Sequence, residues 1–438
     1  MNSIKKLLFS FLLLLLISGY LTELPRLVFP NTWSYRIIHY VLLPLTVIIF
    51  LDIGRRKIKF YYPKNFNFFL FIILTPIIMI FLLEFFLQGF LFLNNTFIRT
   101  VLITTVLVLS FLYLSNIVLK PNDHPKKWLI ELLKPYVFFC LFNSVIGVIV
   151  FLLIQINIIH LENWSIPSFF QINQDFASGR VSQQSMPLYL TLVNVDLFAG
   201  VHRFSGLSIE PHTYALFTTP AVFYLFYVFS HWSFRKKIIG IGIIIFHLIL
   251  TISITFYSMF IIITLLFFIR NISFISKIKI NHIVSILTLI TVCIYTLISY
   301  YDFEFLLNTL ENKLMLEFFY DQGYHTSVWA DYLYPDYLVG TGLLISPEVR
   351  EWGFIFLLLY SCVFIFSIIV GLWLFFKRSS ESLLGLGIVY FFLHLIKDPM
   401  HSFPAPFLIY LYFVTALGMA LSFMKPRHAF DQSINQTV

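Results

Sequence analysis

The sequence predicts an all-α polytopic integral membrane protein with about 12 transmembrane helices and two long loops on its outer face. Three observations favour this fold class. Of the 438 residues, 59% are hydrophobic and only 11% are charged, whereas soluble domains carry about 25% charged residues. The apolar residues gather in long runs, and most basic residues lie in clusters between those runs. A chain with so little polar surface cannot cover a soluble globule, which excludes soluble, fibrous and disordered proteins.

A spanning helix needs about 20 mostly apolar residues, because the hydrocarbon core is about 30 Å thick and each residue rises about 1.5 Å. Runs that suit this requirement cover residues 7–22, 36–53, 66–87, 97–119, 136–159, 212–230, 282–300, 352–376, 381–396 and 405–424. The first run follows Lys5 and Lys6, so a cleaved signal peptide is the alternative interpretation. The amount of hydrophobic chain behind it favours an uncleaved first helix.

Residues 238–269 form a longer apolar stretch, which as one helix would measure about 48 Å and exceed the core thickness even when tilted. Two short helices that meet near residues 253–255 fit better and bring the total to about 12. Residues 186–201 are also apolar, but Asn194 and Asp196 interrupt them. We expect this segment to be an amphipathic or re-entrant helix at the outer surface rather than a further span.

The distribution of charge sets the predicted orientation. With both termini in the cytoplasm, 21 of the 29 Lys and Arg residues fall on the inner side, and 16 of the 21 Asp and Glu residues fall on the outer side. The net charge of +8 is therefore a topology signal, and nucleic acid is not expected as a partner. Residues 1–438 form a single membrane domain in this topology, with long outer loops at 160–211 and 301–351. Long ordered loops on one face usually carry function.

A concentrated polar cluster ends the first long loop, where the chain enters the helix expected from residue 212. Arg203 offers a planar, permanently charged fork that suits phosphate, and Gly206 allows a tight turn or the close approach of a ligand. Glu210 precedes Pro211, a residue well placed at a helix start. The plainer interpretation is a helix N-terminus with an acid near its dipole and an arginine paired with that acid.

The pattern Arg203-x-x-Gly206-x-x-x-Glu210-Pro211 resembles the bacterial O-antigen and capsule polysaccharide polymerases of the Wzy type, which are grouped with the O-antigen ligases. The predicted hairpin at 251–265 is similar to a Thr/Ser-rich turn of that family. The second long loop closes with two further similar elements, Gly340-Thr341-Gly342 and Glu351-Trp352-Gly353. The resemblance is architectural over nearly the whole chain and motif-specific over a small part of it.

Two departures from the family pattern bear on function. The family hairpin often carries an arginine after its serine, but no charge follows Ser253 within the turn. The ligase branch has a His-Asn pair shortly before its Glu-x-Gly element, whereas this chain has Ile345-Ser346-Pro347-Glu348 there. The nearest loop histidine is His325, upstream of Gly340. The missing His-Asn pair favours a polymerase over a ligase.

The resemblance implies a glycosyltransferase-C-like fold in the bacterial inner (plasma) membrane and a glycosyl transfer at the periplasmic face. A growing glycan on undecaprenyl diphosphate would be the donor, and the non-reducing end of a second lipid-linked repeat unit would be the acceptor. The implied partners are undecaprenyl-diphosphate-linked oligosaccharides, membrane lipid, a chain-length regulator and a flippase. A lipid-linked glycan transporter or flippase is the alternative from a different functional class, and the lack of evident internal repeats argues against it.

The residue types suggest roles within such a reaction. Glu210 and His325 are candidates for the base that activates the attacking sugar hydroxyl, with Arg203 as the third catalytic candidate. The candidates for binding the diphosphate or glycan are Arg180, Arg203, Gly206, His212, Arg350, Lys397 and His401. The first outer loop, 23–35, carries no Asp-x-Asp pair. We therefore expect a reaction without a metal or other cofactor.

Overall fold

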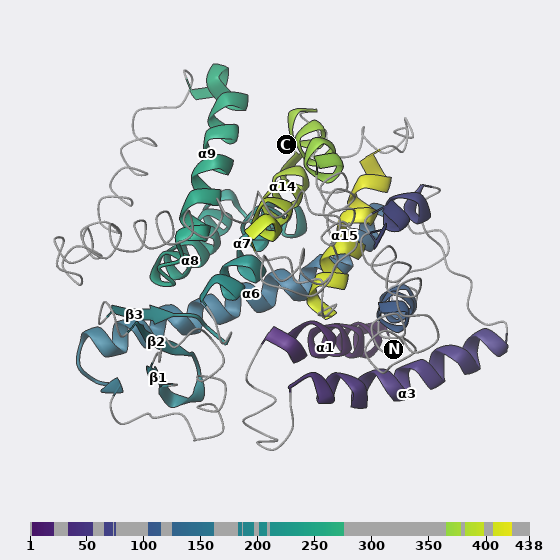
Figure 1. Ribbon diagram of the computed structural model, residues 1–438, viewed down its shortest axis with the longest axis horizontal. Coiled ribbons are helices and arrows are strands. Elements are labelled where there is room, and N and C mark those ends of the chain that lie inside the picture. The colour runs from purple at the N-terminus through teal and green to yellow at the C-terminus, as the bar shows by residue number, and fades with distance from the viewer. Residues whose placement is uncertain are drawn as a thin grey trace, which may run out of the picture.

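The computed structural model describes the chain in segments and shows a mostly helical protein with one small antiparallel sheet (Figure 1). The described residues are 2–21, 34–55, 65–72, 74–75, 104–114, 125–161, 183–185, 187–196, 201–207, 211–275, 365–377, 382–397 and 406–422. The predicted span at 282–300 and the whole second long loop, 301–351, lie outside them. The helical character of the fold is confirmed, and the sheet corrects its description as purely α-helical.

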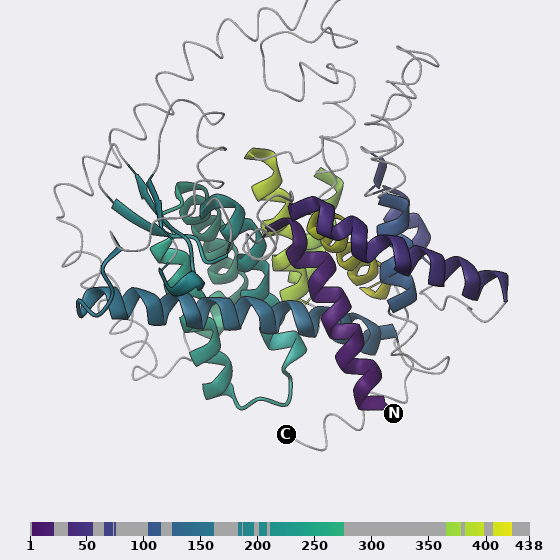
Figure 2. The same ribbon diagram turned by 90° about the horizontal axis from the view of Figure 1, so that it is seen from below.

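The labelled helices are α1 (Asn2–Leu21), α3 (Ser34–Gly54), α6 (Pro125–Gln155), α7 (Pro211–Val228), α8 (Phe234–Leu250), α9 (Ile254–Ile275), α14 (Ser382–Lys397) and α15 (Pro406–Ser422). Helix α7 packs against α6, α8 and α14, while α1 packs against α3, α6 and α15. An ion pair of 3.0 Å between Lys6 and Glu131 joins the beginnings of α1 and α6. In Figure 2 the connection between α7 and α8 lies at the same edge as the start of α1.

One helix in the described part of the chain is long and apolar enough to cross a bilayer, namely residues Lys126–Gln155 of α6. Shorter apolar helices accompany it at Leu43–Gly54, Thr104–Leu114, Tyr214–Val228, Ile365–Phe376, Ser382–Leu393 and Tyr410–Leu421. The 12-span arrangement thus stays a prediction.

The long apolar stretch at 238–269 is divided between two helices, as the sequence predicted. Helix α8 ends at Leu250, α9 begins at Ile254, and residues 251–253 form the turn between them. We call these three residues the α8–α9 turn. Ile252 has a positive φ of 47°, which a β-branched residue rarely adopts. The two helices are thus separated by a residue in the left-handed backbone conformation, and the Thr251 hydroxyl at the end of α8 donates to the Leu248 carbonyl at 2.6 Å.

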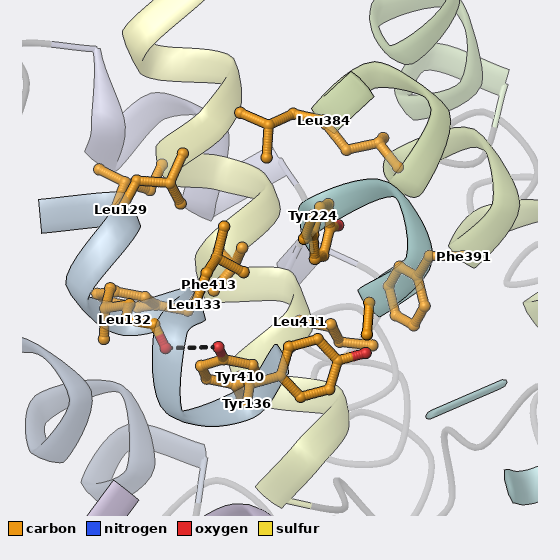
Figure 3. Packing of buried hydrophobic residues seen from close by; sticks show 14 of the residues in the cluster. Leu129, Leu132, Leu133, Tyr136, Tyr224, Leu384, Phe391, Tyr410, Leu411 and Phe413 are labelled. Atoms are coloured by element: carbon orange, nitrogen blue, oxygen red, sulfur yellow. Dashed lines mark hydrogen bonds between the residues drawn. The ribbon is translucent and has the colours of Figure 1, made fainter. Parts of the chain in front are cut away.

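Two prolines inside helices are each accompanied by a buried tyrosine hydroxyl. Pro135 in α6 and Pro220 in α7 remove one helical hydrogen bond each. In the same turns, the Tyr410 hydroxyl donates to the Leu132 carbonyl at 2.9 Å, as Figure 3 shows, and the Tyr136 hydroxyl donates to the Phe217 carbonyl. These bonds connect α15 to α6 and α6 to α7. Each bond gives a buried tyrosine hydroxyl a partner in an apolar core, where leaving such a group unpaired costs about 1–3 kcal/mol.

The segment 186–201 is not the expected helix. It holds β2 (Val193–Asp196) and the start of β3 (Val201–Phe204), which pair antiparallel with each other, and β2 also pairs with β1 (Gln183–Ser185). A single 3-10 turn, η4 (Pro187–Tyr189), precedes β2. The run Val-Asn-Val-Asp alternates apolar and polar residues with period two, which is the periodicity of a strand rather than of a helix.

The sheet is attached to the helices through its apolar side chains. Val193 of β2 and Phe204 of β3 are buried against Phe151 of α6 and Leu250 of α8. The rings of Phe151 and Phe204 meet edge to face, with centroids 5.3 Å apart. The sheet therefore lies beside the C-terminal ends of α6 and α8 (Figure 1).

Candidate functional site

The predicted site residues are described to different extents. Arg203 lies in β3 and Gly206 in the turn that follows it. His212 is the second residue of α7, and Lys397 is the last residue of α14. The remaining predicted residues lie outside the described residues: Arg180, Glu210, His325, Arg350 and His401.

Arg203 is bound to the α8–α9 turn. Its Nε donates to the Thr251 carbonyl at 3.2 Å, and its Nη2 donates to the Ile252 carbonyl at 3.3 Å. The planar guanidinium suits this two-pronged contact, since it presents several donors in a rigid fork. The positive charge also lies at the C-terminal end of α8, where the helix dipole favours a cation. Arg203 therefore anchors the sheet to the helices, a role that the sequence did not indicate.

The turn at Ser205–Leu207, called here the Gly206 turn, is buried and tightly held. The Gly206 carbonyl accepts from the Leu192 amide at 2.5 Å and from the Thr191 hydroxyl at 3.2 Å. The Ser205 amide donates to the Leu192 carbonyl at 2.9 Å. Gly206 has φ +60°, and a Cβ atom there would lie 2.6 Å from the Tyr214 ring. Glycine is required at this position for both its backbone conformation and its small size.

A buried chain of polar side chains lies directly beneath the Gly206 turn. The Tyr214 hydroxyl of α7 lies 2.7 Å from Nδ1 of His247 in α8 and 3.1 Å from the Ser144 hydroxyl in α6. All three residues are at most 1% exposed. We call Ser144, Tyr214 and His247 the polar chain. It connects three helices at the end of the bundle that carries the sheet.

Two neighbouring residues complete the surroundings of the polar chain. Gly147 lies against the His247 ring so closely that a Cβ atom would be 2.2 Å from Nε2. Asn143, one turn earlier in α6, places its Nδ2 2.8 Å from the position of a Cβ on Gly206. Within the described part of the chain, His247 Nε2 and Asn143 Oδ1 are buried and have no hydrogen-bond partner. His247 and Asn143 are thus enclosed by closely packed neighbours.

His202 adds a titratable group to the sheet beside Arg203. Partial burial lowers the pKa of His202 below its ordinary value of 6.5, because desolvation penalises the charged imidazolium. His202 is paired in register with Val195 of β2. It therefore favours the neutral form at neutral pH.

Sequence reasoning missed most of the polar chain. His247 lies in the interior, where its Nδ1 is bonded to Tyr214 while its Nε2 has no partner among the described residues. Ser144 and Tyr214 were not predicted, although the pair Asn143-Ser144 within an apolar run, followed one turn later by Gly147, was a usable signal. No group of His, Cys, Asp or Glu residues suited to a metal ion occurs among the residues that the structure describes.

Comparison with known proteins identifies no relative of this chain. No family model matches the chain, and neither does any curated protein or solved structure.

Proposed function

We propose that this protein is a polysaccharide polymerase that transfers a growing glycan from undecaprenyl diphosphate to a lipid-linked repeat unit at the outer face of the bacterial plasma membrane. The observation that supports this most is the contact between Arg203 and the α8–α9 turn. The sequence resemblance rests separately on the Arg203–Pro211 motif and on the turn near Ser253, and these two distant segments meet at one end of the bundle.

The ends of the helices suit an anionic leaving group at this place. Ile254, the N-terminal residue of α9, directly follows the α8–α9 turn that Arg203 contacts, and Pro211, the N-terminal residue of α7, comes eight positions after Arg203 in the sequence. Helix N-termini carry partial positive charge and favour anions such as diphosphate. In this proposal they and the Arg203 charge stabilise the departing undecaprenyl diphosphate. Arg180, Arg350 and Lys397 remain further candidates for binding that group.

The proposed transfer breaks one bond and forms one bond. A hydroxyl of the acceptor sugar attacks the anomeric carbon of the donor glycan, and the bond from that carbon to the diphosphate oxygen breaks. Glu210 or His325 accepts the hydroxyl proton as general base. His212 and His401 belong to the proposed glycan-binding set. The reaction needs no redox partner, because the diphosphate carries away the bonding electrons.

The surface of α6 supports placement in a lipid bilayer. Its apolar residues Phe138, Phe142 and Leu152 are exposed, whereas its polar residues Asn143 and Ser144 are buried. A soluble helix shows the opposite arrangement, and a helix surrounded by lipid shows this one.

The basic residues support the proposed orientation. Lys126 of α6 lies over the Tyr227 ring, 5.6 Å from its centroid, and Lys237 of α8 donates to the Ser230 carbonyl at 3.2 Å. These lysines lie at the ends of their helices far from Phe151 and Leu250, where the sheet packs. Basic residues on the cytoplasmic side would place the sheet and Arg203 on the outer side.

An O-antigen ligase and a lipid-linked glycan transporter are the alternatives that a genetic experiment separates. A deletion strain is complemented with wild-type protein, Arg203→Ala or Glu210→Ala, and its surface polysaccharide is resolved on a gel. We expect wild-type protein alone to restore a ladder of repeat units above a single repeat on the lipid anchor. Polymer that accumulates on the lipid carrier would indicate a ligase, and single repeats trapped on the cytoplasmic side would indicate a transporter.

A further inference from the structure

The Gly206 turn lies midway along the segment that joins Arg203 to α7, so its shape governs how both ends of that segment are presented. Besides its hydrogen bonds to Thr191 and Leu192, the turn rests on the ring of Tyr214. The contact is close because glycine leaves room for the ring. A tilt of Tyr214 would therefore remove the support beneath Gly206 or push against it.

The orientation of Tyr214 is fixed through its hydroxyl group. That oxygen has two partners on two other helices, His247 Nδ1 at 2.7 Å and the Ser144 hydroxyl at 3.1 Å. A buried tyrosine that rotates away from both partners leaves polar groups unpaired in an apolar interior, which is costly. The hydroxyl bonds therefore hold the ring in the position that the Gly206 turn requires.

His247 connects this support to the Arg203 anchor. It lies one turn before Thr251 in α8, and the Thr251 carbonyl accepts the bond from Arg203 Nε. Gly147 packs against the His247 ring and leaves no space for the ring to swing toward α6. One helix end thus holds both the beginning of the segment, through Arg203, and its middle, through Tyr214.

We propose that Tyr214 and His247 are positioning residues, which fix the Gly206 turn so that Arg203 and the start of α7 act on one substrate together. This inference rests on the proposed function for its catalytic consequence. Its structural part, that the polar chain holds the turn, stands independently. Neither residue touches the reacting atoms in this proposal, so their loss lowers the rate of the bound complex rather than substrate affinity.

The test uses full-length protein, purified in detergent and supplied with undecaprenyl-diphosphate-linked repeat units. Four variants are compared with wild type: Tyr214→Phe, His247→Leu, His247→Asn and Tyr224→Phe. Asparagine places an amide near the Nδ1 position and keeps a partner for Tyr214, so it serves as the conservative rescue. Tyr224 is a buried tyrosine farther along α7 and is the matched control for loss of a hydroxyl. Hydrogen exchange at the Leu192 and Ser205 amides is measured on the same samples.

We expect Tyr214→Phe and His247→Leu to lower kcat about 10- to 100-fold with KM unchanged, since small misplacements of reacting groups have effects of this size. Exchange at Leu192 and Ser205 should quicken in both variants, and His247→Asn should restore both quantities in large part. Tyr224→Phe should leave them as in wild type.

Unchanged kcat and unchanged exchange in Tyr214→Phe would overturn the proposal. A rise in KM at constant kcat would also overturn it, because it would indicate a role in binding. If wild-type protein transfers no glycan, the proposed function is wrong, and faster exchange in Tyr214→Phe but not in Tyr224→Phe would still establish that the polar chain holds the turn.

Discussion

Arg203 illustrates how one residue can serve both the fold and the proposed chemistry. Its two bonds to the carbonyls of Thr251 and Ile252 need a two-pronged donor, which lysine cannot supply in the same geometry. We expect Arg203→Lys to keep the charge but to lose activity at least about tenfold, since one carbonyl left without its partner costs about 1–3 kcal/mol. Initial rates of glycan elongation measure the loss. Full activity in Arg203→Lys would indicate that charge alone matters.

Gly206 provides a second prediction at this scale. Gly206→Ala introduces a residue with φ near +60°, at a cost of about 1–2 kcal/mol, and brings its Cβ within 2.6 Å of the Tyr214 ring. We expect less stable protein and a shortened or absent polysaccharide ladder. Gly242→Ala is the control, because a Cβ there meets nothing within 4 Å. Equal losses in both variants would contradict the importance of the turn.

His202 predicts a dependence of stability on pH. Because burial lowers its pKa in the folded protein, the unfolded chain binds a proton first as the pH falls. The contribution of His202 to stability is therefore present above its ordinary pKa of 6.5 and is lost as the pH falls from there through the lower folded value. Thermal unfolding at pH 7.5, 6.5 and 5.5 should show a steeper loss for wild type than for His202→Gln. Parallel losses would contradict this assignment.

At the scale of elements, the α8–α9 turn stores backbone strain at Ile252. Ile252→Gly removes the unfavourable contacts of a β-branched side chain at φ 47°, and we expect a net gain in stability of about 1 kcal/mol. Ile252→Ala is the matched control, since it shortens the side chain but keeps a Cβ. The free energy of unfolding in detergent is the measurement. A loss of stability in the glycine variant would show that the side-chain contacts outweigh the strain.

The elements also show what could be predicted from the sequence and why. The break within 238–269 was predictable, because length alone forbids a single spanning helix. The strand at Val193–Asp196 was mistaken for part of a helix, because overall apolarity was weighed above the alternation of its four residues. The sequence marked Ser144 as a polar residue within an apolar run, but the pairing within the polar chain could not be predicted, since its contacts join residues 33 and 70 positions apart on different helices.

At the scale of the whole molecule, polarity and charge are arranged along the bundle. The polar chain, the Gly206 turn and the Arg203 anchor lie at the end where the sheet packs, and Lys126 and Lys237 lie toward the other end. Apolar side chains are exposed along α6 between these two ends. Such an arrangement suits a membrane protein whose chemistry takes place at one face, and it places Arg203 against the α8–α9 turn.

The proposed transfer can be followed in a reconstituted system. Purified protein in lipid nanodiscs is incubated with undecaprenyl-diphosphate-linked repeat units, and the glycans on the carrier lipid are resolved by size together with the released undecaprenyl diphosphate. Polymerase activity predicts a ladder that grows by whole repeat units, with one undecaprenyl diphosphate released per step, in wild type but not in Glu210→Gln. Repeat units that stay single, with no release of undecaprenyl diphosphate by folded wild-type protein, would contradict it.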